Sequence, residues 1–348
     1  MKGWKNVKKI IGIVMAVLMM FPMAACSGSK TGAKTEEGKA RYKFSLALDS
    51  PEDTVTYLFA DKFKQLLQKK SDGRMQLQIY SNGQMGGDIE IIESVQAGDV
   101  NFGVQNTAPQ VNFIPELAVF DMPSVFPDVK IARETLDGPF FEKINTVYEK
   151  AGFKLLALAD QGFRTMSTNK KVETIADFKG QKIRTMENPY HVAYWKALGA
   201  NPTPMAFSEV YIGLQQGTID AQENPYEVIV SAKLYEQQKY VINTNHLLHI
   251  ITLIANPEKY DKIAPEDQKI VNEAATEAKE WARRKADERV TDKIKIMKEK
   301  GVEIIDINPE LQAEITRKSQ GIYTMIRSKI GNELPDELLK GVEEAKKK

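Results

Sequence analysis

Two arginines and one asparagine between residues 162 and 225 have the types and the spacing that suit capture of a small carboxylate. Arg184 ends a short β-type run, Arg164 lies beside a second run, and Asn224 lies in a polar corner. A planar guanidinium offers two parallel N–H donors to a carboxylate and keeps its charge when it is buried. The segment therefore predicts a carboxylate site, with simple pairing of both arginines to surface acids as the alternative.

Strand and helix patterns alternate around these residues and must position them. Residues 75–80 alternate with period two, as a half-buried strand does, and residues 53–69 place apolar side chains at helical spacing. This βαβα order favours an α/β architecture on parallel or mixed sheets, in which ligands collect at the carboxyl ends of strands. The predicted strands are 43–48, 75–80, 102–104, 154–158 and 181–184, and the predicted helices include 53–69, 88–97 and 190–198.

A long helix is predicted over residues 265–300. Pro265 suits the first turn, no further glycine or proline interrupts the segment, and Gly301 is a natural stop. At ~1.5 Å per residue the helix is roughly 50 Å long, which exceeds the width of one small domain. We therefore expect it to lie across two lobes, with a helix pair broken near Arg283 and Arg284 as the alternative.

The first 25 residues have the pattern of a secretory signal peptide. Four lysines precede an apolar run over residues 10–21 that is too short to span a membrane, and small residues follow. Cys26, the only cysteine, stands where a bacterial lipoprotein carries its lipid, although an ordinary signal with a chance cysteine is the alternative. Residues 26–41 are mostly polar and predict a flexible tether. The folded part is thus expected to be extracytoplasmic and lipid-anchored to the cell membrane.

Composition and motifs argue against several classes of protein. The 47 acidic and 48 basic residues nearly cancel, so no overall field attracts nucleic acid. No glycine-rich phosphate loop is present, and neither Ser167 nor Ser208 has the glycine flanks of a nucleophile elbow. Nothing fixes Glu209 and Glu223 as an acid–base pair opposite a bond to be broken. The sequence therefore predicts no cofactor, no nucleic-acid partner and no enzymatic activity.

The three histidines are weak evidence for a metal site. His246 and His249 share one helical or turn face at spacing i, i+3, and His191 is distant in sequence. Two histidines without a nearby cysteine are more often hydrogen-bonded polar residues than metal ligands. We expect no metal.

Several short motifs occur in a defined order in the third quarter of the chain. They are Phe178-Lys179-Gly180, Ile183-Arg184, Ala197-Leu198-Gly199-Ala200-Asn201-Pro202, Phe207-Ser208-Glu209-Val210-Tyr211 and Gln222-Glu223-Asn224-Pro225. In this order and spacing the segment resembles the substrate-binding proteins of TRAP transporters, the tripartite ATP-independent uptake systems. Weaker similarity covers most of the chain after residue 42.

The resemblance implies a two-lobed, periplasmic-binding-protein-like α/β fold with hinge strands and a long helix spanning both lobes. It assigns residues 42–162 and about 250–290 to lobe I. Residues 163–249 and about 291–348 are assigned to lobe II.

The resemblance also implies roles for individual residues. Arg184 is expected to form the main salt bridge to the substrate carboxylate, Arg164 a second charged contact, and Asn224 a hydrogen bond to the same group. Phe207 is expected to form an apolar wall, although a plain core position is the alternative. Fixed donors suit a desolvated anion, because an uncompensated buried charge is costly.

Specificity is expected from the other end of the pocket. Glu187 corresponds to a ligand-facing position, and Asp88 and Asn106 match two further contact regions. A carboxylate at 187 repels a second substrate carboxylate but accepts hydrogen bonds from hydroxyls, which favours a sugar acid such as a hexuronate. A C4-dicarboxylate is the alternative ligand, and an acid at a helix start is the alternative role of Glu187.

The resemblance thus predicts a monomeric solute receptor that closes its lobes on a small organic acid. The receptor would then dock to TRAP permease subunits, which are driven by an ion gradient and not by ATP. A sensor feeding a signalling receptor and an extracytoplasmic enzyme acting on sugar acids are the alternative classes.

Overall fold

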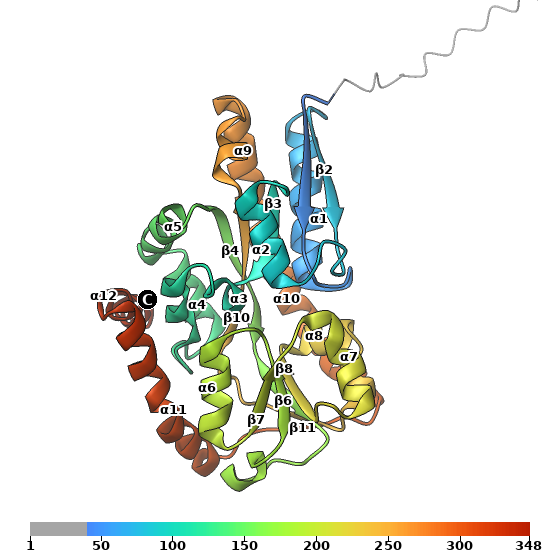
Figure 1. The fold of residues 1–348 in the computed structure, drawn as a ribbon, viewed down its shortest axis with the longest axis vertical. Helices are drawn as coiled ribbons and strands as arrows, with labels where there is room; N and C mark the ends of the chain where they lie inside the picture. The colour runs from blue at the N-terminus through green and yellow to red at the C-terminus, as the bar shows by residue number, and fades with distance from the viewer. Residues whose placement is uncertain (1–39) are drawn as a thin grey trace, which may run out of the picture. The chain divides into compact units, whose positions relative to one another are not determined.

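The computed structural model describes residues 40–348. The predicted signal peptide over residues 1–25, the predicted lipid-attachment residue Cys26 and all but the end of the predicted tether over residues 26–41 lie outside the described residues. The described part contains two β-sheets, drawn one above the other in Figure 1. No helix within residues 40–348 combines the length and the apolar character needed to cross a membrane.

The first sheet has five strands in the order β2-β1-β3-β10-β4. β1 pairs in parallel with β2 and β3, whereas β10 pairs antiparallel with β3 and β4. The period-two strand and the helix predicted over residues 88–97 occur with the predicted bounds. The bounds are β1 Tyr42–Ala47, α1 Val55–Lys70, β2 Met75–Tyr80, α2 Asp88–Ala97, β3 Phe102–Asn106, β4 Lys154–Phe163 and β10 Leu248–Ala255.

The second sheet has six strands in the order β11-β9-β5-β8-β6-β7. β5 pairs antiparallel with β8, and β6 pairs in parallel with β7 and β8. The bounds are β5 Thr165–Thr168, β6 Lys182–Thr185, α6 Pro189–Leu198, β7 Asn201–Pro204, α7 Phe207–Gln216, β8 Ala221–Asn224, α8 Tyr226–Ser231, β9 Tyr240–Ile242 and β11 Glu303–Ile305. The polar corner predicted around Asn224 is therefore the end of a short buried strand.

Three segments of the described chain connect the two sheets. Arg164 is the single residue between β4 and β5, residues 243–247 join β9 to β10, and the third connection contains α9 (Pro257–Asp261) and α10 (Pro265–Glu299). This arrangement confirms the predicted two-lobed α/β fold with crossing strands.

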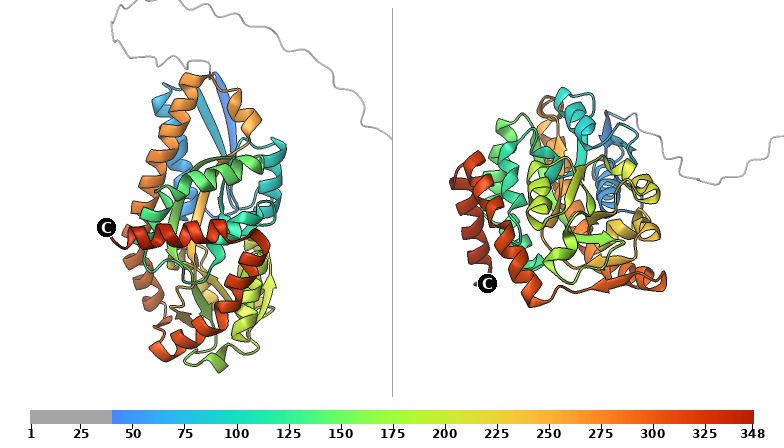
Figure 2. Two further views of the ribbon diagram at one scale, coloured as in Figure 1. Left: turned by 90° about the vertical axis from the view of Figure 1, so that its left-hand side faces the viewer. Right: turned by 60° about the horizontal axis from the view of Figure 1, so that its bottom comes forward.

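The long helix α10 is continuous, so the alternative of a broken helix pair is wrong. Its buried alanines up to Ala286 pack with α1 and the first sheet, whereas Met297 packs with side chains of α7, α8 and β9. Figure 2 shows α10 running along one side of both sheets. The small alanine side chains allow close approach of α1, which explains the long contact between these helices.

The carboxyl-terminal helices cover a second side of the molecule. α11 (Pro309–Ile330) packs against α6, and α12 (Glu333–Ala345) packs against α4 (Val129–Leu136) and α5 (Phe140–Lys150). The last residues do not pack with the second sheet. The apolar face of α12, with Leu338 and Val342, is instead buried against helices that lie between β3 and β4 in the sequence. The remaining described helices are α3 Thr107–Gln110, η1 Pro115–Asp121, η2 Ile175–Phe178 and η3 Leu234–Gln237.

Replacing a buried alanine of α10 should destabilise the fold by overpacking. Ala278 is fully buried against α1, so we expect Ala278→Leu to lower the free energy of unfolding by about 1–3 kcal/mol. Thr276→Leu is the matched control, because Thr276 lies on the exposed side of the same helix. Equal unfolding free energies of the two variants, measured by urea denaturation, would contradict the packing described for α10.

Candidate functional site

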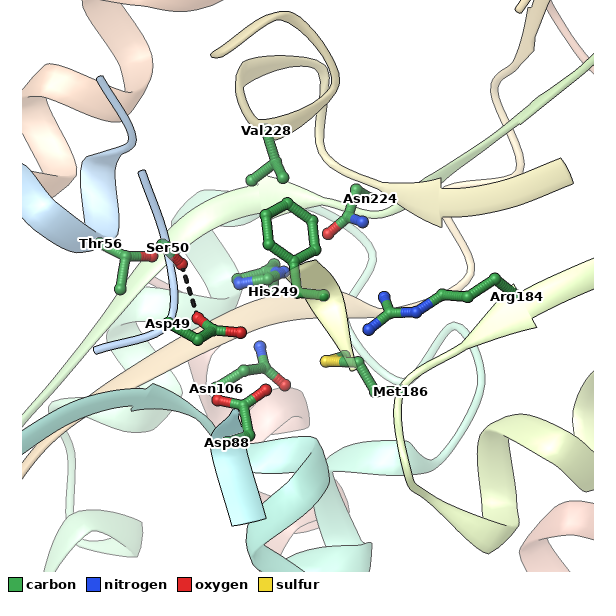
Figure 3. A pocket seen from close by; sticks show the side chains of 11 residues that line it. Asp49, Ser50, Thr56, Asp88, Asn106, Arg184, Met186, Asn224, Val228 and His249 are labelled. Carbon is green, nitrogen blue, oxygen red and sulfur yellow. Dashed lines mark hydrogen bonds between the residues drawn. The ribbon is translucent and has the colours of Figure 1, made fainter. Parts of the chain in front are cut away.

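A small cavity lies between the two sheets, where strand ends and helix starts converge (Figure 3). The convergence follows from the chain order, because the loops after β1, β3, β6 and β8 all open toward this point. Its volume is about 30 Å³. The lining residues are Asp49, Ser50, Thr56, Asp88, Asn106, Arg184, Met186, Phe207, Asn224, Val228 and His249.

Arg184 is the cationic group of the cavity. Its side chain comes from β6 and is 1% exposed, and its Nε and Nη2 donate to the carbonyl oxygen of Met205 at 2.9 and 2.6 Å. The guanidinium carbon lies 5.8 Å from the ring centre of Phe207, so the ring supports one side of the cation. Burial lowers the pKa of Arg184, against the opposite effect of Glu223, but an arginine remains charged. A fixed guanidinium with N–H groups facing the cavity can bind a carboxylate.

Two carboxyl groups form the opposite end of the cavity (Figure 3). Asp88 is the first residue of α2, and Asp49 follows β1 and accepts a hydrogen bond from Ser50 Oγ at 2.9 Å. Burial raises the pKa of Asp88 well above its ordinary value, and the carboxylates of Asp49 and Glu187 raise it further. Burial likewise raises the pKa of Asp49. The cavity thus has one cationic end and one crowded acidic end.

Two asparagines between these ends are held by the protein itself. Asn106 caps α3, with Oδ1 accepting from Ala108 N at 2.8 Å and Nδ2 donating to the Ile250 carbonyl at 2.9 Å. Asn224 ends β8 and donates from Nδ2 to Gln222 Oε1 at 2.7 Å. These bonds fix the orientation of both amides before any ligand binds.

Behind the cavity lies a buried charged cluster centred on Arg164 and Glu223, which are 1% and 0% exposed. Arg164 donates to both carboxylate oxygens of Glu223, with an Nη2–Oε1 distance of 2.9 Å, and its Nη1 contacts Nδ1 of His249. His246 Nε2 lies 3.1 Å from Glu223 Oε2, and His191 Nδ1 lies 3.7 Å from Oε1. His249 also lines the cavity, so the cluster reaches the cavity through this ring.

The protonation states of the cluster follow from these contacts. Burial by itself raises the pKa of Glu223, but Arg164 and the two histidines outweigh it and hold the pKa well below the ordinary range. Burial lowers the pKa of His246 and, more strongly, that of His249, where Arg164 adds to the effect. Burial lowers the pKa of His191 too, but Asp121 and Glu223 raise it to about 8. Glu223 is therefore a carboxylate and His249 a neutral ring.

Five of the seven residues predicted for the site line the cavity: Arg184, Asn224, Phe207, Asp88 and Asn106. Arg164 does not line it, because its guanidinium is engaged by Glu223. Glu187 does not line it either; it is half-buried, and its carbonyl oxygen accepts from Asn112 Nδ2 at 2.7 Å. Its carboxylate is nevertheless close enough to raise the pKa of Asp49 and Asp88. Direct contact of Arg164 and Glu187 with a ligand stays a prediction.

Several lining residues were not singled out from the sequence. Asp49 and Ser50 directly follow a predicted strand, and their place at its carboxyl end was a usable signal. His249 was expected to be a hydrogen-bonded polar residue, and the sequence left open whether it reaches the cavity, which it lines. The remaining lining residues, Thr56, Met186 and Val228, carry no distinguishing local pattern. Within residues 40–348 no group of three or more His, Cys, Asp or Glu side chains is arranged to hold a metal ion.

The sequence of residues 46–329 matches the family model of the bacterial extracellular solute-binding proteins, family 7. The chain belongs to this family. Its members are extracytoplasmic solute receptors and not enzymes, which confirms the resemblance drawn from the motifs of residues 178–225.

Similar proteins include receptors for several acids. The chain is 34% identical to the 2,3-diketo-L-gulonate-binding periplasmic protein YiaO of Escherichia coli (strain K12), over 83% of this chain and 87% of the relative. It is 29% identical to the C4-dicarboxylate-binding protein DctB of Bacillus subtilis (strain 168), over 86% and 85%. The solved structure of the sugar acid binding protein DctPAm from Advenella mimigardefordensis, in complex with galactonate, has a TM-score of 0.85 and 29% identity and covers 87% of this chain and 98% of that one.

The raised pKa of His191 should make the stability of this family member fall with rising pH. Its protonated form is stabilised in the folded protein, so the contribution is complete below pH 6.5 and is lost as the pH rises through about 8. A change in pKa from 6.5 to about 8 corresponds to about 2 kcal/mol. We therefore expect His191→Gln to lower the free energy of unfolding, measured in urea, by about 2 kcal/mol more at pH 6 than at pH 9.

His246→Gln is the matched control for this experiment. The pKa of His246 is lowered, so the loss caused by His246→Gln should not become smaller between pH 6 and pH 9. A His191→Gln effect that stays constant from pH 6 to pH 9 would show that His191 is not held protonated by Asp121 and Glu223.

Proposed function

We propose that this protein is the extracytoplasmic receptor of a TRAP-type uptake system and that it captures a small monocarboxylate rich in hydroxyl groups, such as a hexuronate or another sugar acid. The observation that carries the proposal is the polarity of the cavity, with Arg184 at one end and Asp49 and Asp88 at the other. Membership of the solute-binding family supports the receptor class.

Arg184 is the proposed partner of the substrate carboxylate. Its Nε and part of its Nη2 are occupied by the Met205 carbonyl, which leaves the cavity-facing side of the fork for the ligand. Asn224 is proposed to hydrogen-bond the same carboxylate, and Phe207 to form an apolar wall beside it. Arg164 is proposed to support this end through His249 and Glu223, in addition to the direct contact inferred from the sequence.

The acidic end is the proposed reason for selectivity. Carboxyl groups of Asp49 and Asp88 accept hydrogen bonds from hydroxyls, and when protonated they also donate. A second carboxylate on the substrate would raise the pKa values of both acids further and would face the nearby charge of Glu187, which is unfavourable. The relatives named for diketogulonate and galactonate support a sugar acid, whereas the relative named for C4-dicarboxylates represents the competing ligand.

Closure of the lobes is the proposed mechanism of capture. Asp49, Asp88 and Asn106 belong to the first sheet and its helices, and Arg184 and Asn224 belong to the second. A cavity of about 30 Å³ has room for roughly two water molecules, so a six-carbon acid requires the lobes to separate before it enters. A ligand that contacts both sides then favours the closed form through its differential affinity.

The cellular setting is also part of the proposal. The receptor is proposed to be lipid-anchored through Cys26, to act as a monomer and to deliver its solute to TRAP permease subunits. Membership of the family supports the permease partner, and the signal-like pattern over residues 1–26 supports the anchor.

A thermal-shift screen of the purified protein tests the function directly. The panel contains uronates, aldonates, C4-dicarboxylates, keto acids and sialic acid, and a ligand at a hundredfold excess over Kd stabilises the folded state by about 2.7 kcal/mol. We expect a shift with a hydroxylated monocarboxylate. A shift with dicarboxylates alone would overturn the proposed specificity, and no shift with any acid would overturn the receptor proposal.

Arg184→Ala should abolish most of the affinity for the acid found in that screen. Removing one partner of a buried charge pair costs ~2–5 kcal/mol of binding free energy, as calorimetry would measure it. Arg184→Lys should also bind weakly, because a point charge cannot replace the planar fork. Arg284→Ala is the control, since Arg284 is exposed on α10. Wild-type affinity of Arg184→Ala would exclude this arginine as the carboxylate partner.

Asp88→Asn should weaken the discrimination between monocarboxylates and dicarboxylates. The substitution keeps the shape of the side chain but removes the acid that faces the cavity. We expect the ratio of the Kd for succinate to the Kd for galactonate to fall by at least tenfold, which is about 1.4 kcal/mol. Glu90→Gln, two residues after Asp88 on α2 and outside the cavity lining, is the control. An unchanged ratio would remove Asp88 from the specificity argument.

A further inference from the structure

Two cations of α10 lie where this helix passes from the core of one lobe to that of the other. Ala286 packs in the core beside the first sheet and Met297 in the core beside the second, and Arg289 and Lys293 lie between them. Their side chains are only 19% and 8% exposed. Largely buried cations require an anion close by, because an uncompensated charge is costly to desolvate.

Asp53 supplies this anion from the first lobe. It lies in the loop between β1 and α1, with Oδ1 at 2.6 Å from Arg289 Nη2 and Oδ2 at 2.7 Å from Lys293 Nζ. Arg289 Nη2 also donates to the Asp53 carbonyl oxygen at 2.7 Å. The lowered pKa of Asp53 agrees with this arrangement, since Lys293, Ser231 and Arg289 outweigh the effect of burial. Asp53 is therefore a carboxylate bound to two cations.

Ser231 connects the same group to the second lobe. It is the last residue of α8, and its Oγ lies 2.8 Å from Asp53 Oδ2 and accepts from Lys293 Nζ at 2.9 Å. Asp53 and Ser231 are 178 residues apart in sequence, so this contact joins the loop after β1 directly to the helix after β8.

The contact lies next to the cavity without being part of it. Thr56, three residues after Asp53, lines the cavity from α1, and Val228, three residues before Ser231, lines it from α8. Closing the lobes over a ligand would bring Thr56 and Val228 together. Because Asp53 lies beside Thr56 and Ser231 lies beside Val228, the same movement would bring Asp53 into contact with Ser231. Neither Asp53 nor Ser231 lines the cavity itself.

We propose that Asp53, Ser231, Arg289 and Lys293 form a latch that holds the two lobes closed, so that Asp53 sets the affinity for the ligand without touching it. The proposal rests on the proposed function, because it assumes capture by lobe closure. A contact made only in the closed form shifts the equilibrium toward that form and slows ligand release.

A neighbouring acid limits the strength of this latch. Glu227 on α8 is 1% exposed, and its Oε1 lies 3.5 Å from Arg289 Nη2 and 3.1 Å from Ser231 Oγ. When Asp53 withdraws, Arg289 keeps Glu227 as a partner on the same side, and Lys293 keeps its hydrogen bond to Ser231 Oγ. The side chain of Asp53 is also 62% exposed, so solvent screens its ion pairs. The latch therefore tunes affinity and leaves the lobes free to open.

The test compares Asp53→Asn with wild type in stopped-flow binding of galactonate and in the thermal stability of the ligand-free protein. We expect the dissociation rate constant to rise about threefold to tenfold, with the association rate constant and the ligand-free Tm unchanged. Ser231→Ala should also raise the dissociation rate constant, but by less, because Arg289 and Lys293 still bind Asp53.

Glu277→Gln is the matched control on the same helix. The Lys70–Glu277 pair, at 2.5 Å, joins α1 to α10 within one lobe, so its loss should alter neither rate constant. A purely structural role for Asp53 would instead lower the ligand-free Tm and leave the dissociation rate constant unchanged, which would overturn the latch.

A distance measurement separates failure of the latch from failure of the proposed function. Spin labels at Lys69→Cys in α1 and Ser208→Cys in α7, with Cys26 replaced by serine, report the separation of the lobes with and without galactonate. Longer distances in Asp53→Asn than in Glu277→Gln support the latch even if galactonate does not bind. Identical distance distributions and identical release rates in these two variants overturn it, whereas wild-type protein that binds no acid of the panel overturns the proposed function.

Discussion

The Arg164–Glu223 ion pair is the interaction on which the arrangement of the site depends. Arg164 is the only residue between β4 and β5, and therefore lies where the chain passes from one sheet to the other. Glu223 lies in β8, beside Asn224 of the cavity. Such a buried pair contributes little net stability compared with apolar packing, but loss of either partner would leave an unpaired buried charge. The pair thus fixes the relation of β4, β5 and β8 and, through His249, one wall of the cavity.

The cavity in front of this pair has an uneven distribution of charge. Arg184 is held by the Met205 carbonyl, whereas Asp49 and Asp88 face it from the other sheet with raised pKa values. Burial of like charges is unfavourable, and a ligand that brings hydroxyl groups to the acids and a carboxylate to the arginine relieves both ends. The same arrangement is the basis of the proposed selectivity and of the proposed closing of the lobes on the ligand.

Closure and release place opposite demands on the contacts between the lobes. The core alanines of α10 hold this helix firmly to α1, whereas polar contacts predominate around Asp53 and Ser231. Exposed ion pairs are weak and reversible, in contrast to apolar packing of the same area. The proposed latch beside the cavity is therefore polar and easily opened, whereas the apolar core lies away from it.

Local patterns in the sequence were enough to predict the α/β class, the bounds of β2 and α2, the continuous helix from Pro265 and a carboxylate-binding role for Arg184. These features follow from local periodicity, turn signals and motif spacing, which act over a few residues. The sequence also indicated Asn224, Phe207, Asp88 and Asn106, which came from the resemblance and which all line the cavity.

The pairing of the charged groups, in contrast, could be learned only from the folded structure. Arg164 and Glu223 are 59 residues apart and meet because β5 and β8 are antiparallel neighbours, so Arg164 binds an internal acid and does not line the cavity. Asp49, after β1, lines the cavity, whereas Glu187, after β6, does not. A carboxylate has no local preference for one cation over another; the partner that it meets is set by strand order and by which groups are buried together.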